Sequence, residues 1–247
     1  TASNNVAVGN NALKDNTTGA QNTACGADNL NSNTTGSHNT AFGYDPLDSN
    51  TTGSYNTAAG AYCLASNTTG AQNSALGYQS LHANTTGNYN TATGYQTLKA
   101  NTTGDHNTAG GYETMFSHTT GDHCTAYGIQ ALRTNTTADN NTAFGSAALY
   151  STTTGADNTG LGYQAGYSNT TGYNNVFVGK GCGGVTTGQS NTYIGANLSG
   201  GDANNFVKLY QGSIIASYGP SSSSWSFSSD GRDKTDIVDL PLGLDFI

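Results

Sequence analysis

Two histidines in this sequence are spaced so that they could share a metal ion. His123 stands at position i+17 relative to His106. Each directly follows an aspartate, Asp105 in the first case and Asp122 in the second. Imidazole nitrogens and carboxylate oxygens are common zinc ligands, so the four side chains form a candidate metal site if positions at this spacing lie side by side. Solvated turn residues are the simpler interpretation, and we expect no cofactor.

Five tyrosines fall on the same spacing or on multiples of it: Tyr44, Tyr78, Tyr95, Tyr112 and Tyr163. An exposed track of tyrosine rings is a candidate surface for binding sugars. The same rings could instead fill an interface between subunits, because a tyrosine buries its ring while its hydroxyl finds a polar partner. We favour the interface.

The i+17 spacing is that of the whole sequence, whose repeating unit reads N-T-T-G-x-x-N-T-A-x-G-x-x-x-L-x-x. One glycine column follows the paired threonines: Gly19, Gly36, Gly53, Gly70, Gly87, Gly104, Gly121, Gly155 and Gly172. A second column ends the N-T-A-x-G stretch: Gly9, Gly26, Gly43, Gly60, Gly77, Gly94, Gly111, Gly128, Gly145, Gly162 and Gly179. About twelve units fit between residues 5 and 200, which is typical of a solenoid.

Each unit has the composition of a short β-coil. The N-T-A-x-G stretch predicts a strand, the x-x-L stretch can supply a second strand, and N-T-T-G predicts a turn in which Asn and Gly tolerate positive φ. The fold class is therefore all-β, a parallel β-solenoid or β-roll of about twelve 17-residue coils. Strands stacked about 4.8 Å apart give a shaft roughly 55 Å long.

Stacking places each position of the unit above its equivalents, so that the unit forms columns. The strand Asn column should form an amide ladder: Asn5, Asn22, Asn39, Asn56, Asn73, Asn90, Asn107, Asn141, Asn158 and Asn175. The Ala column marks a place for small side chains: Ala24, Ala41, Ala58, Ala75, Ala92, Ala109, Ala126 and Ala143. The Leu column is the main apolar spine: Leu13, Leu30, Leu47, Leu64, Leu81, Leu98, Met115, Leu132 and Leu149.

Eight asparagines open the N-T-T-G turns and fit the pattern for N-glycosylation: Asn16, Asn33, Asn50, Asn67, Asn84, Asn101, Asn135 and Asn169. The turn chemistry of the repeat explains this turn Asn column without glycans. Four cysteines, Cys25, Cys63, Cys124 and Cys182, do not suggest a disulfide framework, and we expect free thiols. His82 and His118 are expected at the surface.

One large side chain per repeat unit makes a thin core. Burial of that side chain hardly offsets the entropy lost when a coil is ordered. We therefore expect each chain to bury further apolar surface against copies of itself, in an elongated homotrimer.

The charge of the chain excludes one class of partner. Only 9% of the residues are charged and the net charge is −8. The basic residues are scattered and form no stripe that could neutralise phosphates, so we expect no nucleic acid partner. No run of apolar residues is long enough to span a bilayer, and we expect no membrane insertion.

The repeat resembles that of bacteriophage tail-fibre shafts and is similar to the head repeats of trimeric autotransporter adhesins. The resemblance covers roughly residues 5–200. It implies a fibrous trimeric β-structure, but it does not by itself distinguish a phage from a bacterial surface.

The C-terminal part of the sequence resembles the start of the intramolecular chaperone domain of phage tail fibres and endosialidase-type tailspikes. The match covers residues 225–247 and contains an S-D-x-R-x-K motif at residues 229–234. The resemblance implies that this domain drives trimerisation and then cuts the chain at Ser228–Ser229. Ser229 would be the nucleophile, Lys234 the assisting base and Arg232 the arginine of the motif.

One position departs from that family, since Asp233 stands where an apolar residue is common. Most of such a domain would lie beyond Ile247. The sequence therefore divides into a repetitive shaft, residues 1–200, a distal β tip or neck, residues 201–228, and the beginning of a truncated chaperone domain, residues 229–247. Short strands are expected near residues 205–210 and 224–228 of the tip.

The resemblance implies a structural and adhesive tail-fibre component of a virion. Its expected partners are two copies of itself, other tail or baseplate proteins, and a glycan or protein receptor on the host surface. The first alternative is the head of a trimeric adhesin on a bacterial cell surface. The second is a polysaccharide-degrading tailspike, which would need paired carboxylates, whereas the repeats contain one glutamate, Glu113. We expect no enzyme beyond a single self-cleavage.

Overall fold

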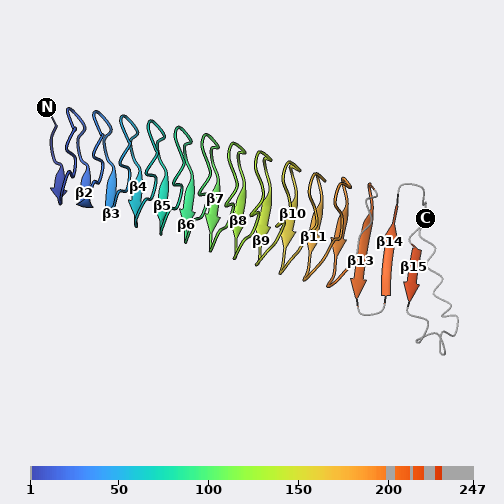
Figure 1. Cartoon of the computed structure of the whole chain (residues 1–247). Coiled ribbons are helices and arrows are strands. Elements are labelled where there is room, and N and C mark those ends of the chain that lie inside the picture. The colour runs from blue at the N-terminus through green and yellow to red at the C-terminus, as the bar shows by residue number, and fades with distance from the viewer. Residues whose placement is uncertain (1, 199–203, 212–213, 220–225, 230–247) are drawn as a thin grey trace.

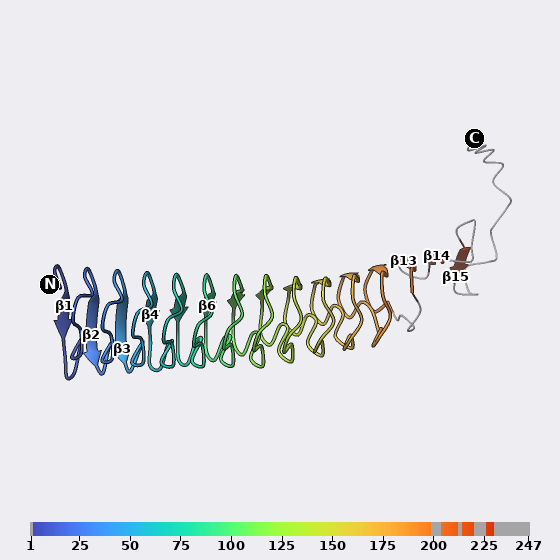
Figure 2. The same ribbon diagram turned by 90° about the horizontal axis from the view of Figure 1, so that it is seen from above.

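The described part of the chain is one long stack of β-coils. The computed structural model describes residues 2–198, 204–211, 214–219 and 226–229. Within these ranges the chain forms one 15-stranded sheet and no helix. Figure 1 shows the coils standing side by side in chain order, and Figure 2 shows the same row from above. The expected parallel β-solenoid of about twelve coils is confirmed, and each described coil is wound by a single chain.

Each coil contributes one strand to a continuous parallel ladder. The strands are β1 Val6–Val8, β2 Thr23–Ala27, β3 Thr40–Tyr44, β4 Thr57–Ala59, β5 Ser74–Leu76, β6 Thr91–Thr93, β7 Thr108–Gly110, β8 Thr125–Tyr127, β9 Thr142–Phe144, β10 Thr159–Leu161, β11 Val176–Val178 and β12 Thr192–Ile194. Equivalent residues pair, as Thr23 does with Thr40. The order is that of the sequence, so no strand crosses over another.

The last strands shorten the coil and then reverse direction. Val176 of β11 pairs with Thr192, and Thr192 of β12 pairs with Val207 of β13 (Val207–Gln211), so the interval between paired positions shrinks at each of these two steps. β13 then pairs antiparallel with β14 (Ile214–Tyr218), which pairs antiparallel with β15 (Ser226–Ser229). β13 and β15 overlap the short strands expected near residues 205–210 and 224–228.

The glycine that ends each strand is required by the close stacking of coils. Gly60 has φ +135°, a conformation that L side chains rarely adopt. A Cβ atom at this position would lie 2.6 Å from the carbonyl oxygen of Gly77 in the next coil. The second glycine column therefore follows from backbone packing.

The Leu column lies in a turn, which corrects the expectation of a second strand. Leu64 has φ +50°, and a left-handed backbone costs an ordinary residue about 1–2 kcal/mol. A hydrogen bond and the burial of the side chain offset this conformational cost. The Leu64 amide donates to the carbonyl of Ser80 in the next coil at 3.1 Å, and the leucine side chain is fully buried. Turns as well as strands are thus hydrogen-bonded from coil to coil.

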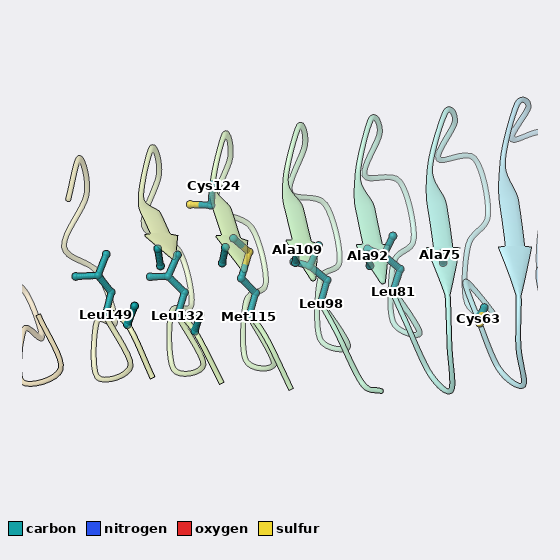
Figure 3. Close-up of a cluster of buried hydrophobic side chains, with 14 of the residues drawn as sticks. Cys63, Ala75, Leu81, Ala92, Leu98, Ala109, Met115, Cys124, Leu132 and Leu149 are labelled. Carbon is teal, nitrogen blue, oxygen red and sulfur yellow. The ribbon is translucent and has the colours of Figure 1, made fainter. Parts of the chain in front are cut away.

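The Ala and Leu columns meet inside each coil and form a narrow core. Figure 3 shows Ala92 and Ala109 on the strand side, with Leu81 and Leu98 reaching toward them from the turn. These side chains are fully or almost fully buried. The apolar spine and the small-residue column are therefore placed as the sequence predicts.

Large and small residues exchange sides near the end of the stack. Gly160 stands in the Ala column and Gly166 in the Leu column, while Phe177 and Tyr193 bring large rings to the strand side. A Cβ atom on Gly166 would lie 2.6 Å from the Phe177 ring. The Phe177 and Tyr193 rings stack with centroids 5.7 Å apart. The Phe177 ring of the next coil therefore occupies space that a larger side chain at Gly166 would need.

Buried asparagines join the coils in two ways. In the strand Asn column, the backbone amide of Asn56 donates to Oδ1 of Asn39 at 2.9 Å, and Nδ2 of Asn39 donates to the Gly53 carbonyl at 2.9 Å. The expected ladder is therefore present, although it runs mainly through backbone groups. Amide-to-amide bonds dominate in the turn Asn column, where Nδ2 of Asn50 donates to Oδ1 of Asn33 at 2.9 Å.

The turn Asn column is buried. Nδ2 of Asn50 also donates to the Gly53 carbonyl at 3.0 Å, so both of its hydrogens are engaged. Asn33, Asn50, Asn67, Asn84, Asn101, Asn135 and Asn169 are all 0% exposed. Asn16, in the first turn, is partly buried. The N-T-T stretches thus act as structural turns, and the seven fully buried amides are not accessible to an oligosaccharide.

We expect Leu98→Ala to lower the free energy of unfolding by about 2–5 kcal/mol, because the stacked backbone cannot close the cavity. Denaturant titration measures the change. Thr103→Ala, at an exposed turn position, is the control and should change stability by less than about 0.5 kcal/mol. Equal losses in the two variants would contradict the assignment of the Leu column to the core.

Candidate functional site

The four candidate metal ligands come together as surface ladders. His106 and His123 are exposed, and their rings stack with centroids 4.9 Å apart at an interplanar angle of 23°. The Tyr89 ring stacks on the other side of His106 at 4.7 Å. Oδ1 of Asp105 accepts the backbone amide of Asn88 at 2.6 Å, and Oδ1 of Asp122 accepts that of Asp105 at 2.7 Å.

This geometry favours stacking over chelation. Nitrogens of stacked imidazoles point in parallel directions, whereas a shared zinc ion needs two nitrogens converging on it, each about 2.0–2.1 Å away. No group of three or more metal-ligating side chains occurs among the residues that the structure describes. We therefore propose no metal at these residues.

Four of the five candidate tyrosines belong to one continuous track. Tyr78 stacks on Tyr95 at 5.5 Å, and Tyr95 stacks on Tyr112 at 5.2 Å. Tyr44 joins them through Tyr62, which makes edge contacts of 5.4 Å with Tyr44 and 6.0 Å with Tyr78. Sequence reasoning missed Tyr62, because it stands one position later in its coil and bridges the coil in which Ala61 replaces the tyrosine.

Stacked rings cover both faces of Tyr95 and one face each of Tyr78 and Tyr112, whereas Tyr44 meets its neighbour edge to face. The five candidate tyrosines are between 41% and 51% exposed. Tyr163 stands apart, with Ser146 and Lys180 at the equivalent positions before and after it. A sugar that stacks needs an open aromatic face, so this geometry favours ladder stabilisation or contact with another chain.

The outward face of the strand ladder carries an apolar stripe that sequence reasoning did not single out. The residue after the Ala column points away from the core, and these residues pair with one another from coil to coil. We call them the outer stripe, whose large apolar members are Val8, Phe42, Leu76, Tyr127, Phe144, Leu161, Ile194 and Leu209. Each of these is between 38% and 57% exposed. The same column also holds the smaller residues Cys25, Ala59, Thr93 and Gly110, and Val178, which is partly buried.

The outer stripe runs the length of the shaft. From Val8 in β1 to Leu209 in β13, each residue of the stripe is the ladder partner of the stripe residue in the next strand. Thr93 and Gly110 pair in the middle of the shaft and divide the stripe into two apolar stretches. Exposed apolar surface of this extent is typical of an interaction surface. The only signal for it in the sequence is the variable but often apolar x of N-T-A-x-G.

Residues directly after the Leu column form a second unforeseen ladder. Nζ of Lys99 lies 5.4 Å from the centroid of the Phe116 ring, and the Arg133 guanidinium lies 5.1 Å from the same ring. The rings of Tyr150 and Tyr167 stack at 5.1 Å. This position has no preferred residue type in the repeat, so the periodic pattern gave no indication of it.

The residues of the expected self-cleavage are only partly described. Ser228 and Ser229 lie in β15, where their backbones pair with Ile215 and Ile214 of β14. Lys234 and Arg232 lie outside the described residues. The structure therefore places the expected scissile bond at the end of an antiparallel strand and does not bear on its chemistry.

The four cysteines are free thiols. Burial raises the pKa of Cys63 to about 11, that of Cys124 to about 12 and that of Cys182 to about 11. These three thiols are thus neutral and unreactive near neutral pH. Cys25 is only partly buried and lies in the outer stripe.

His118 is fully buried, so the expectation that it lies at the surface is wrong. It occupies the turn Asn column, and its Nε2 makes a 2.7 Å hydrogen bond with the Gly121 carbonyl. Oδ1 of Asn101, the preceding residue of that column, has no hydrogen-bond partner, and neither has Nδ1 of His118. The histidine thus interrupts the amide ladder. Burial lowers the pKa of His118, because desolvation disfavours the imidazolium.

Comparison of the chain with known protein families, with curated proteins and with solved structures finds no match. Among the described residues, no helix has the length and apolar character that crossing a bilayer requires.

We expect His118→Asn to stabilise the fold at pH 7 by about 1 kcal/mol, because the new amide can donate to Oδ1 of Asn101. It should also reduce the loss of stability in acid. The unfolded chain protonates His118 near its ordinary pKa of about 6.5, whereas the folded chain resists protonation. Stability is therefore complete above that pH and falls as the pH drops below it.

Denaturant titrations at pH 7.5, 6 and 5 measure both effects. His123→Asn removes an exposed imidazole and is the matched control. If the two variants respond alike, or if His118→Asn is less stable than the parent at pH 7.5, the gap in the ladder is not the cause.

Proposed function

We propose that this chain is the shaft of a bacteriophage tail fibre, in which three copies pack in parallel and hold the fibre tip against the host surface. The outer stripe is the observation that carries the proposal. The chain is otherwise polar, with 34% hydrophobic residues, yet it exposes large apolar side chains along one face of the strand ladder from Val8 to Leu209.

A second copy of the chain fits this stripe better than a globular partner. The stripe repeats once per coil, at about 4.8 Å. Another stack of the same coils, parallel and in register, offers apolar side chains at the same interval on both sides of the Thr93–Gly110 interruption. A globular protein would cover only a few coils.

Three copies around one axis can each turn the outer stripe inward. Cyclic symmetry of this kind closes the assembly and leaves no apolar face for further addition. The thin core of each coil, one alanine facing one leucine, is also consistent with stability that depends on partner chains.

The likeness of residues 225–247 to a phage chaperone domain supports the virion over the surface of a bacterium as the location. A trimeric adhesin head would use the same shaft and would continue into a coiled-coil stalk. A tailspike that degrades polysaccharide is less favoured, because Glu113 accepts hydrogen bonds from Gln130 and Arg133 at 3.1 and 2.9 Å and is held as a structural anion.

We expect the chain to have a solution mass three times its own 25.2 kDa. Light scattering measures the mass. Leu76→Glu and Phe144→Glu, two exposed members of the outer stripe, should lower it toward one chain, because a carboxylate is costly to bury between subunits. Thr103→Glu, on an exposed turn, should leave the trimer intact.

Cross-linking at the partly buried Cys25 tests the register. A short thiol-to-thiol reagent should join Cys25 of different copies, since the other three cysteines are buried. A single-chain mass for the parent protein, or a mass unaffected by either glutamate variant, would exclude the outer stripe as the interface.

We further propose that the full-length gene product is cut at Ser228–Ser229. Mass spectrometry of the expressed product should find a shaft ending at residue 228. Ser229→Ala should leave the chain intact, because it removes the proposed nucleophile. Ser226→Ala, in the same strand, is the control and should still be cut. Recovery of uncut parent chain would rule out self-cleavage.

A further inference from the structure

One column on the surface of the shaft contains only cations and aromatic residues over six consecutive coils. It directly follows the Leu column, and we call it the cation–aromatic ladder: His82, Lys99, Phe116, Arg133, Tyr150 and Tyr167. In earlier coils the same column holds Lys14, Asn31, Asp48 and Ala65, with no aromatic residue.

The side chains of the ladder contact one another along the fibre axis. Phe116 lies between Lys99 and Arg133, whose charged groups are 5.4 and 5.1 Å from its centroid. Arg133 also lies 6.0 Å from the Tyr150 ring, and Tyr150 stacks on Tyr167. These contacts hold long side chains in place and reduce the entropy that ligand binding would cost.

The ladder has two permanent cations, Arg133 and Lys99, and only Arg133 is paired with a carboxylate. Nε of Arg133 pairs with Oε2 of Glu113 at 2.9 Å. Lys99 makes no salt bridge to any carboxylate in the described part of the chain. Lys99 therefore holds an uncompensated positive charge on a protein whose net charge is −8. Such a charge is complementary to an anion from outside the chain.

A row of amides runs beside the ladder. Nε2 of Gln96 donates to Oε1 of Gln79 at 2.7 Å, and Nε2 of Gln130 donates to Oε2 of Glu113 at 3.1 Å. The Glu113–Arg133 pair joins this row to the ladder. The face thus combines planar amides, a guanidinium, an ammonium and aromatic edges over roughly 24 Å of shaft.

We propose that this face binds an acidic polysaccharide lying along the fibre axis. Amides and the guanidinium suit sugar hydroxyls and anionic groups, and Lys99 selects for negative charge. Nucleic acid is less favoured, because its affinity requires many phosphate contacts and the ladder has two permanent cations. The inference rests on the proposed function, since it gives the shaft a contact with the surface that the fibre reaches.

Four polymers test the proposal: polygalacturonate, which carries carboxylates, dextran sulfate, neutral dextran and single-stranded DNA. Titration calorimetry with the intact chain should detect binding of an anionic polymer and none of dextran. Lys99→Gln should weaken it about fivefold, the value of one exposed charge contact of about 1 kcal/mol. Lys14→Gln removes the same charge from the same column, away from the aromatic residues, and should leave the affinity unchanged.

The anionic polymer that binds with the higher affinity shows whether the preferred anion is a carboxylate or a sulfate-like group. Equal losses in Lys99→Gln and Lys14→Gln, equal binding of dextran, or tighter binding of single-stranded DNA would each overturn the proposal. Light scattering on the same samples separates it from the proposed function. A trimer that binds no polymer refutes this inference alone, whereas a monomer that binds refutes the fibre alone.

Discussion

Stacking of equivalent residues at the distance between neighbouring β-strands is the constraint on which the whole shaft depends. Thr23 pairs with Thr40, Ala24 with Ala41, and Gly26 with Gly43, so a residue of these columns has its own kind in the neighbouring coil. A residue type can therefore occupy a column in successive coils only if it packs or bonds favourably against a copy of itself. The unit therefore uses groups that bond to themselves, such as amides and stacked rings.

The same constraint shapes the backbone. Gly60 cannot carry a side chain, because the next coil lies against it. Leu64 adopts a left-handed conformation because its amide then reaches a carbonyl of the next coil. Buried asparagines complete the bonding in the turns. Coil-to-coil hydrogen bonds thus replace the large apolar core that a globular protein of this size would have.

The sequence predicts this stack well, because positions fixed by burial repeat the same residue. Asn39, Ala41 and Leu47 are visible as columns for that reason. The backbone conformation of Leu47 cannot be predicted in this way, since a lone apolar residue gives the same sequence pattern in a turn as in a short strand. Tyr62 and Lys99 are partly exposed and differ in type from the equivalent residues of the neighbouring coils, so only the structure shows which side chains they contact. His118 looks like a surface substitution until the burial of its column is known.

The switch from β12 and β13 to the antiparallel strands β14 and β15 has a consequence for the length of the assembly. An end formed by a parallel coil presents amides and carbonyls on which another identical coil could continue the ladder. The antiparallel pairing of Val207 with Tyr218 and of Ala216 with Phe227 replaces that end with one of a different hydrogen-bond pattern. The meander thus removes, at this side of the described stack, the parallel edge on which a further coil could continue the ladder in the same hydrogen-bond pattern.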